Sequence, residues 1–79
     1  MTIKKNIATS EEGFVFNPST GDSFSTNPLA GDIIALLKEN KVRAEIIDLV
    51  CKKYDVDENQ FERDLDDFES QLKDYGIID

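Results

Sequence analysis

Residues 57–79, DENQFERDLDDFESQLKDYGIID, carry the clearest structural signal in this 79-residue chain. Their large apolar residues recur at steps of 4, 3 and 4, which is typical of one face of an amphipathic helix. These residues are Phe61, Leu65, Phe68 and Leu72. Gly76 predicts the helix end, because glycine readily adopts the left-handed conformation that closes a helix, and Ile77-Ile78 should fold back as an apolar end piece.

The same segment is strongly acidic. It holds nine acids and two bases, so −7 of the chain's net charge of −8 falls within residues 57–79. Binding to a nucleic acid duplex requires lysine and arginine to neutralise phosphates, so a helix of this charge is repelled by DNA. The surface that this helix builds should recognise another kind of ligand, and a peptide is the first candidate.

A β-hairpin is predicted upstream. Residues 14–16 alternate as Phe-Val-Phe, which indicates a strand with both phenylalanines on one face. Residues 17–21 read Asn-Pro-Ser-Thr-Gly, a typical turn, and residues 22–26 return as the second strand. A short edge strand is expected within residues 3–8. We expect Phe14, Phe16 and Phe24 to form one half of a core whose other half is the Phe61/Phe68 stripe.

Two further helices are predicted between the hairpin and the acidic helix. Asn27-Pro28 predicts a helix start, because an asparagine side chain can cap the N-terminus of a helix and proline fits the first helical position. This helix should end near Glu39-Asn40. Gly31 inside it costs roughly 1 kcal/mol relative to alanine, which a close approach of the helix to the sheet would explain. The next helix should span residues 44–54. Asp55 and Asp57 are expected to cap the third helix, which begins near Asp57.

The composition disfavours most catalytic chemistry. The chain has no histidine and a single cysteine, Cys51, so Ser-His and Cys-His catalysis, Cys/His zinc sites and internal disulfides are excluded. Cys51 lies on the apolar side of a predicted helix and is interpreted as a small hydrophobic residue. Residues 55–66 resemble a calcium loop only in their opening, because Gln60 stands where the loop needs glycine. The sequence predicts no catalytic residue, no metal site and no cofactor.

Length and hydropathy set the broad class. Seventy-nine residues predict a single domain, 1–79, with enough apolar residues for one core. No stretch approaches 18 consecutive apolar residues, so the predicted location is cytoplasmic and no membrane partner is expected. If the hairpin keeps an exposed edge strand, the unpaired N–H and C=O groups of that strand can pair with an incoming peptide. The apolar face of the acidic helix would then form a wall beside the peptide.

The chain resembles the coenzyme PQQ synthesis protein D (PqqD) family over roughly residues 12–78. The resemblance rests on a set of residues spread along the chain. They are Asn17-Pro18-x-x-Gly21-x-x-Phe24-x-Thr26-Asn27, Ile33, Leu36-Leu37, Glu45-Ile46, Leu49, Tyr54, Val56, Glu62-Arg63-Asp64-Leu65-x-x-Phe68, Leu72 and Gly76-Ile77-Ile78. One departure is Val42, because the family usually opens its second helix with threonine or serine; Asn40 is a candidate replacement for that cap.

The resemblance implies an α+β fold that is winged-helix-like, with a small three-stranded antiparallel sheet packed on three helices. It also implies a peptide-binding recognition element, which holds the leader segment of a ribosomally made precursor peptide by strand addition. The partner would be a modifying enzyme, often a radical S-adenosylmethionine (SAM) enzyme. The expected peptide-binding residues are Asp22, Ser23, Phe24, Ser25, Thr26, Phe61, Asp64, Leu65 and Phe68.

Two other classes stay open at this point. A winged-helix-type transcriptional regulator would need a basic face, for which one small cluster exists around the second helix. Its residues are Lys38, Lys41, Arg43, Lys52 and Lys53. The other alternative is a purely structural partner module that is attached to an enzyme without touching its substrate.

Overall fold

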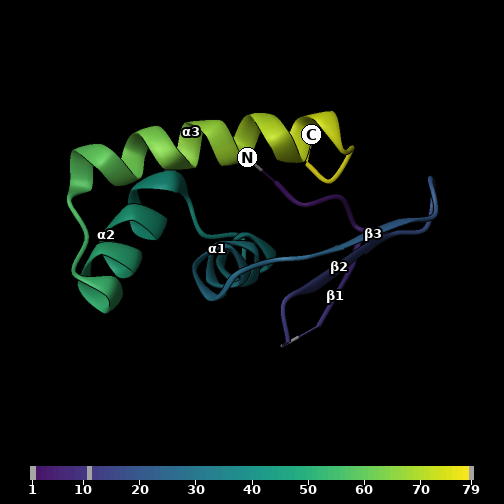
Figure 1. Cartoon of the computed structure of the whole chain (residues 1–79), viewed down its shortest axis with the longest axis horizontal. Helices are drawn as coiled ribbons and strands as arrows, with labels where there is room; N and C mark the ends of the chain where they lie inside the picture. The colour runs from purple at the N-terminus through teal and green to yellow at the C-terminus, as the bar shows by residue number, and fades with distance from the viewer. Residues whose placement is uncertain (1, 11, 79) are drawn as a thin grey trace.

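The computed structural model describes residues 2–10 and 12–78, which form three strands followed by three helices (Figure 1). The strands are β1 (Ala8–Thr9), β2 (Phe14–Asn17) and β3 (Asp22–Ser25). The helices are α1 (Pro28–Lys38), α2 (Arg43–Tyr54) and α3 (Glu58–Asp74). The strands form one antiparallel sheet in the order β1-β2-β3, so the expected α+β architecture is confirmed.

The β2–β3 hairpin has the predicted turn. The N–H groups of Thr20 and Gly21 both donate to the carbonyl of Asn17, at 3.3 and 2.8 Å. Gly21 has a φ of 79°, a conformation that costs glycine little. Asn17 pairs with Asp22, so four residues connect the strands, and this length places Val15 opposite Phe24.

The predicted role of Phe14 and Phe16 in the core is wrong. Their side chains are 54% and 42% exposed, whereas Val15 between them is only 1% exposed. The register explains the error. Phe24 faces the helices, its cross-strand partner is Val15, and a strand's side chains alternate between faces, so Phe14 and Phe16 point outward. Phe24 does pack against the core, as expected.

The helix starts follow local capping chemistry. The Asn27 side chain accepts a hydrogen bond from the Ala30 N–H at 2.8 Å, and Asp57 accepts one from the Gln60 N–H at 2.9 Å. Val42 has no capping side chain, but its own N–H donates to Glu45 Oε1 at 3.4 Å, which satisfies one otherwise unpaired donor.

Two predicted caps are placed differently. Asp55 was expected to cap α3, but it has a φ of 51° and ends α2 instead. Asn40, the candidate substitute for the missing cap of α2, has a φ of 63° and lies just beyond the end of α1. Aspartate and asparagine are the residues other than glycine that take this left-handed conformation most readily, so they suit helix ends.

Gly31 marks a close approach of α1 to the sheet, as its unfavourable helix propensity suggested. A Cβ atom at this position would lie 3.4 Å from Thr26 Oγ1 and 3.9 Å from the Gly13 Cα. Thr26 is held there because its hydroxyl and its N–H both bond to the Gly13 carbonyl at 2.8 Å.

The core joins both ends of the chain to the helices. Ile3 forms a bridge with Ile78, and the Lys4 N–H donates to the Ile77 carbonyl at 3.0 Å. Ile77 and Ile78 are therefore buried, and Gly76 has a φ of 72°, both as predicted. The predicted extended segment at residues 3–8 is instead divided between this bridge and β1. The buried apolar residues are Ile3, Ile7, Val15, Ile33, Ile34, Leu37, Ile46, Ile47, Val50, Phe61, Leu65, Leu72, Ile77 and Ile78.

None of the helices in the described part of the chain is both long enough and apolar enough to span a bilayer.

Candidate peptide-binding groove

The outer edge of β3 is free for pairing. Among residues 2–10 and 12–78, β3 pairs with β2 alone. The Thr26 N–H points toward β2, since it donates to the Gly13 carbonyl at 2.8 Å. Backbone groups of successive residues alternate between the two sides of a strand, so the N–H and C=O groups of Ser23 and Ser25 point to the free edge. This edge offers a hydrogen-bonding template for another extended chain.

A groove of about 370 Å³, lined by both aromatic and polar residues, lies between this edge and α3. Its aromatic floor includes Phe24 and Tyr75, whose ring centroids are 5.3 Å apart with the planes tilted by 31°. The lining residues are Phe24, Ser25, Thr26, Asn27, Ala30, Phe68, Gln71, Leu72 and Tyr75. A strand that pairs with β3 would direct alternate side chains into this space.

Asn17 sets the separation between the hairpin and α3. It is the one buried polar residue of the described chain, with 4% exposure. Its Nδ2 donates to the Tyr75 carbonyl at 3.2 Å, while its Oδ1 accepts from the Ser19 N–H at 3.0 Å. The turn and the helix end are thus linked through one side chain. A Cβ on Gly76 would lie 3.4 Å from the same Nδ2, so glycine also suits this contact.

The nine predicted peptide-binding residues divide into four groups. Phe24, Ser25, Thr26 and Phe68 line the groove. Asp22 and Ser23 lie on the same strand but outside the groove lining, and Asp64 is an exposed residue of α3.

Two predicted residues lie elsewhere. Phe61 and Leu65 are 2% and 0% exposed, and their side chains belong to the core instead of the groove surface. Because they share a helical face with Phe68, the spacing alone could not separate the residues that face the core from those that face the groove.

The sequence analysis missed several groove residues, of which Gln71 and Tyr75 are the most prominent. Both follow Phe68 on α3 at steps of 3 and 4, so they continue one stripe along the helix. That spacing was a usable signal. Asn27 and Ala30 had no such signal, because they enter the groove only through the packing of α1 beside α3.

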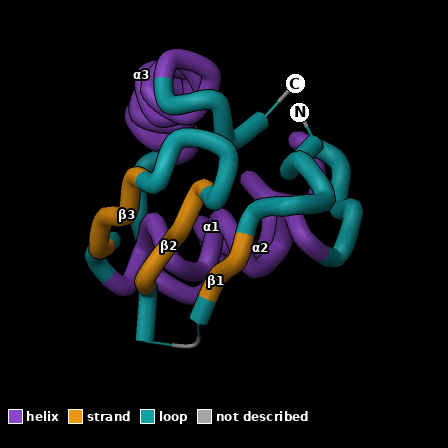
Figure 2. Tube along the Cα trace, turned by 90° about the vertical axis from the view of Figure 1, so that its right-hand side faces the viewer, coloured by secondary structure: helices purple, strands orange, loops and turns teal. Residues whose placement is uncertain are grey.

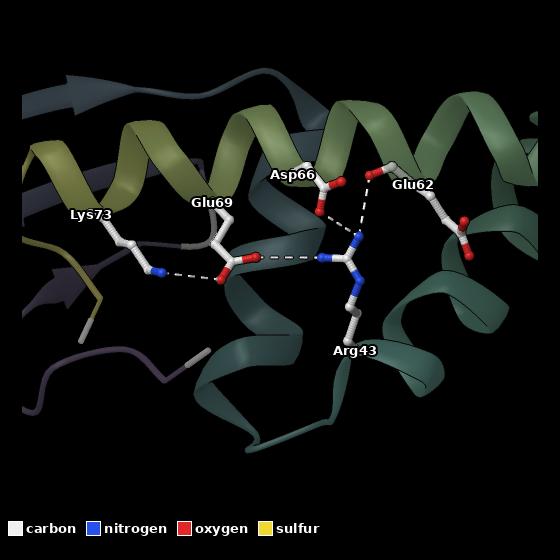
Figure 3. Close-up of polar contacts among 5 residues, drawn as sticks. All are labelled: Arg43, Glu62, Asp66, Glu69 and Lys73. Carbon is white, nitrogen blue, oxygen red and sulfur yellow. Dashed lines mark hydrogen bonds and ion pairs between the residues drawn. The ribbon is translucent and has the colours of Figure 1, made fainter.

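Two acids on the flank of α3 nearest α2, Asp66 and Glu69, are paired with bases of this chain (Figure 3). The Arg43 guanidinium contacts Asp66 at 2.7 Å and Glu69 at 3.4 Å, and it also donates to the Glu62 carbonyl at 3.3 Å. Lys73 adds a second contact to Glu69 at 3.6 Å. These contacts connect the start of α2 to the middle of α3.

The groove side of α3 has a different charge environment. Asp64 lies four residues before Phe68 on the same helical stripe, and Asp67 lies four residues before Gln71. Within the described residues neither carboxylate has an ion-pair partner; Asp64 accepts only a hydrogen bond from Gln60 Nε2, at 3.1 Å. Two carboxylates without an ion pair therefore lie on the flank of α3 that borders the groove and give it a negative charge.

A second polar cluster joins α1 to α2. Asp32 accepts hydrogen bonds from Lys53 Nζ at 2.8 Å and from the Tyr54 hydroxyl. The hydrogen bond from Lys53 is the main cause that lowers the pKa of Asp32, and the same bond raises the pKa of Lys53. The bond to Asp32 also raises the pKa of Tyr54. The cluster lies outside the β3–α3 groove.

Cys51 packs against the core and is half-buried. Burial raises the pKa of its thiol, and surrounding carboxylates including Glu58 and Asp48 reinforce the shift. A thiol with a raised pKa is a poor nucleophile, in agreement with its interpretation as a small hydrophobic residue.

The fold and groove define a small α+β domain whose sheet ends in an open edge beside an acidic, amphipathic helix. The chain belongs to the coenzyme PQQ synthesis protein D (PqqD) family, whose model matches residues 12–78. Its structure is similar to a solved structure titled "TbiB1 in Complex with the TbiA(beta) Leader Peptide", with a TM-score of 0.93 and 29% sequence identity. The similarity covers 100% of this chain and 95% of that chain. No curated protein matches the sequence.

Proposed function

We propose that this chain is a non-catalytic recognition module that binds the leader of a ribosomally made precursor peptide and presents it to a modifying enzyme. A radical SAM enzyme is one candidate for that partner. The observation that carries the proposal is the free β3 edge beside the groove. Membership of the PqqD family and the similarity to a leader-bound structure support it.

The binding mode is strand addition. The leader would pair with the outward N–H and C=O groups of Ser23 and Ser25, which supply affinity with little sequence preference. Alternate leader side chains would enter the groove between Phe24, Phe68 and Tyr75, which supplies selectivity. Of the residues predicted from the sequence, we assign Asp22–Thr26 to the pairing edge and Phe68 to the groove wall.

The transcriptional-regulator alternative is not favoured. Four of the five bases in the candidate basic cluster are already paired with acids of this chain: Lys41 with Glu45, Arg43 with Asp66 and Glu69, Lys52 with Asp48, and Lys53 with Asp32. A paired base gains little by displacing counterions from phosphate. The proposed setting is cytoplasmic, because a ribosomally made peptide first meets its binding partner there.

A nuclear magnetic resonance titration of the isotope-labelled chain tests the proposal. The ligand is the leader segment of a precursor peptide identified by sequencing the genes around the gene of this chain. Chemical shift changes should concentrate on residues 22–27 and on Phe68, Gln71 and Tyr75. A scrambled leader of the same composition is the control. Shifts confined to the Lys52/Lys53 end of α2, or an absence of shifts at millimolar leader, would refute strand addition to β3.

A further inference from the structure

The outer face of the sheet carries two exposed phenylalanines. Phe14 lies opposite Ser25 and Phe16 lies opposite Ser23, so all four side chains share the face that points away from the helices. Ala8, opposite Phe16, belongs to the same face. We call these five residues the outer sheet face. Phe14 and Phe16 remain 54% and 42% exposed because serine and alanine are too small to cover them.

The charge of this face contrasts with that of the chain. None of its five residues is ionisable, although the net charge of the chain is −8. The opposite face of the sheet is covered, since Val15 is 1% exposed and Phe24 packs against the core. Figure 2 shows the three strands in front of α1 and α2, with α3 seen nearly end-on above β3. Two neighbouring exposed phenylalanines on an uncharged face of a charged molecule make this face a candidate interaction surface.

A strand added to β3 would enlarge this same face. Its residues alternate between the groove and the outside, so every second side chain would stand beside Ser23 and Ser25. Neighbouring strands are about 4.8 Å apart, so these side chains would lie roughly 10 Å from the row of Phe14 and Phe16. The bound peptide and the two phenylalanines would form one continuous surface.

We propose that the outer sheet face is the docking surface for the enzyme that modifies the bound peptide. The enzyme would cover Phe14 and Phe16 with an apolar patch and touch the outward side chains of the peptide at the same time. The contact with the peptide rests on the proposed function, whereas the contact with Phe14 and Phe16 does not.

The geometry favours the enzyme as the occupant of this face. An enzyme that contacts the bound leader must approach from a side that the helices leave open. The groove side is closed by α1 and α3, whose residues Ala30, Phe68 and Leu72 line it. Even a weak interface buries on the order of 600 Å² on each partner, which is roughly 25 Å across. A patch of that width centred on Phe14 and Phe16 would include the added strand.

Such a shared surface couples the two binding events. An enzyme that contacts both partners binds the peptide-loaded chain more tightly than the empty chain, and linkage requires the peptide to bind more tightly in the presence of the enzyme by the same factor. A factor of about 5 or more is expected for a coupling of this kind. This reciprocity separates a shared surface from two independent sites.

The experiment uses the full chain, the leader identified in the titration above, and a purified modification enzyme identified from the same search of the surrounding genes. The test variant is the double substitution Phe14→Thr and Phe16→Thr, because threonine keeps a high strand propensity without the rings. The matched control is Leu49→Gln on α2, where leucine is similarly exposed, at 43%. Circular dichroism verifies that each variant folds. Affinities are measured for enzyme without leader, for leader without enzyme, and for enzyme with saturating leader.

The expected result is at least a tenfold loss of enzyme affinity in the double variant, leader affinity within about twofold of wild type, and no change in the Leu49→Gln control. Wild-type affinity for the enzyme should rise at least fivefold with leader.

The proposal is overturned if the double variant binds enzyme like the wild type, or if it loses leader binding instead. It is also overturned if light scattering shows that the wild type is a dimer and the double variant a monomer, because a second copy of this chain then covers the outer sheet face. A leader that binds nowhere refutes the proposed function, while the enzyme measurement without leader still decides the docking face.

Discussion

The side-chain amide of Asn17 donates a hydrogen bond to the backbone carbonyl of Tyr75, 58 residues further along the chain. One partner lies at the β2–β3 turn and the other is the residue that ends α3. The bond therefore fixes one end of the groove between β3 and α3. Because Tyr75 also stacks against Phe24, the same residue belongs to the frame and to the lining of the groove.

Replacing Asn17 with alanine should destabilise the fold and weaken peptide binding together. The substitution leaves the Tyr75 carbonyl and the Ser19 N–H without their partner, at a cost of about 1–3 kcal/mol in the free energy of unfolding. Urea unfolding measures that cost and calorimetry measures leader affinity. Asn6→Ala is the matched control, since Asn6 makes an exposed bond to Ser19 at 2.8 Å and should change stability by less than about 0.5 kcal/mol. Equal stability of the two variants would contradict this role of Asn17.

Phe68→Ala and Phe61→Ala should have different consequences, although the residues lie on one helical face. Phe61 is 2% exposed, so its truncation should cost about 3–5 kcal/mol and leave much of this small domain unfolded. Phe68 is only half-buried and lines the groove, so Phe68→Ala should stay folded and lose about 1 kcal/mol or more of leader binding. Thermal unfolding and leader titration of both variants provide the comparison. A folded Phe68→Ala variant with wild-type affinity would remove this residue from the site.

Ser25→Pro should weaken leader binding while Ser25→Ala should not. Proline removes the N–H that points to the free edge and leaves the pairing with β2 in place, since proline is accepted on edge strands. The loss of one peptide hydrogen bond, with the added ring on the docking edge, should reduce affinity about tenfold. Alanine retains that N–H and loses only a small outward side chain. Equal affinity of the two variants would mean that the leader does not pair with this edge.

The acids beside the groove should control the salt dependence of binding. Asp64→Asn with Asp67→Asn removes two negative charges that have no internal ion pair, so a leader with basic residues should associate more slowly and with less dependence on salt. Asp66→Asn with Glu69→Gln removes the same charge from the flank paired with Arg43 and is the matched control. Stopped-flow association rates at low and high salt test this. A larger effect in the control pair would place the peptide on the other flank.

The Asp32 cluster should stabilise the fold within a defined pH window. The hydrogen bond from Lys53 lowers the pKa of Asp32 in the folded chain. The contribution of Asp32 to the free energy of unfolding is therefore complete above the ordinary aspartate pKa of about 3.9, and it is lost as the pH falls through the lowered pKa. The pKa of Lys53 is raised by the same bond, so its contribution is complete below about 10.4 and is lost as pH rises through the raised value.

The difference in unfolding free energy between wild type and Asp32→Asn should therefore be largest between those two limits and shrink beyond each. Urea unfolding across the pH range measures it. Asp48→Asn is the control, because the Lys52–Asp48 pair is exposed on both sides and should contribute little at any pH. A difference that does not vary with pH would show that Asp32 acts through packing alone.

Local patterns determined most of the secondary structure of this chain. Asn27 and Asp57 cap helices because their short side chains reach nearby N–H groups, and Gly21 and Gly76 close a turn and a helix because they accept positive φ. The stripe from Phe61 to Leu72 required a helix, since only that geometry gathers its apolar residues on one side. All of these depend on interactions within a few residues.

The faces of these elements were decided only by the tertiary structure. The alternation Phe14-Val15-Phe16 fits either face of a strand, and the choice came from a four-residue connection that sets Val15 against Phe24. Phe61 and Phe68 likewise share one stripe, but Phe61 is buried in the core while Phe68 remains half-buried beside the β3 edge. Asn17 reaches Tyr75 only once the hairpin and α3 have packed together. Periodicity fixes which residues lie together, whereas long-range packing fixes what they face.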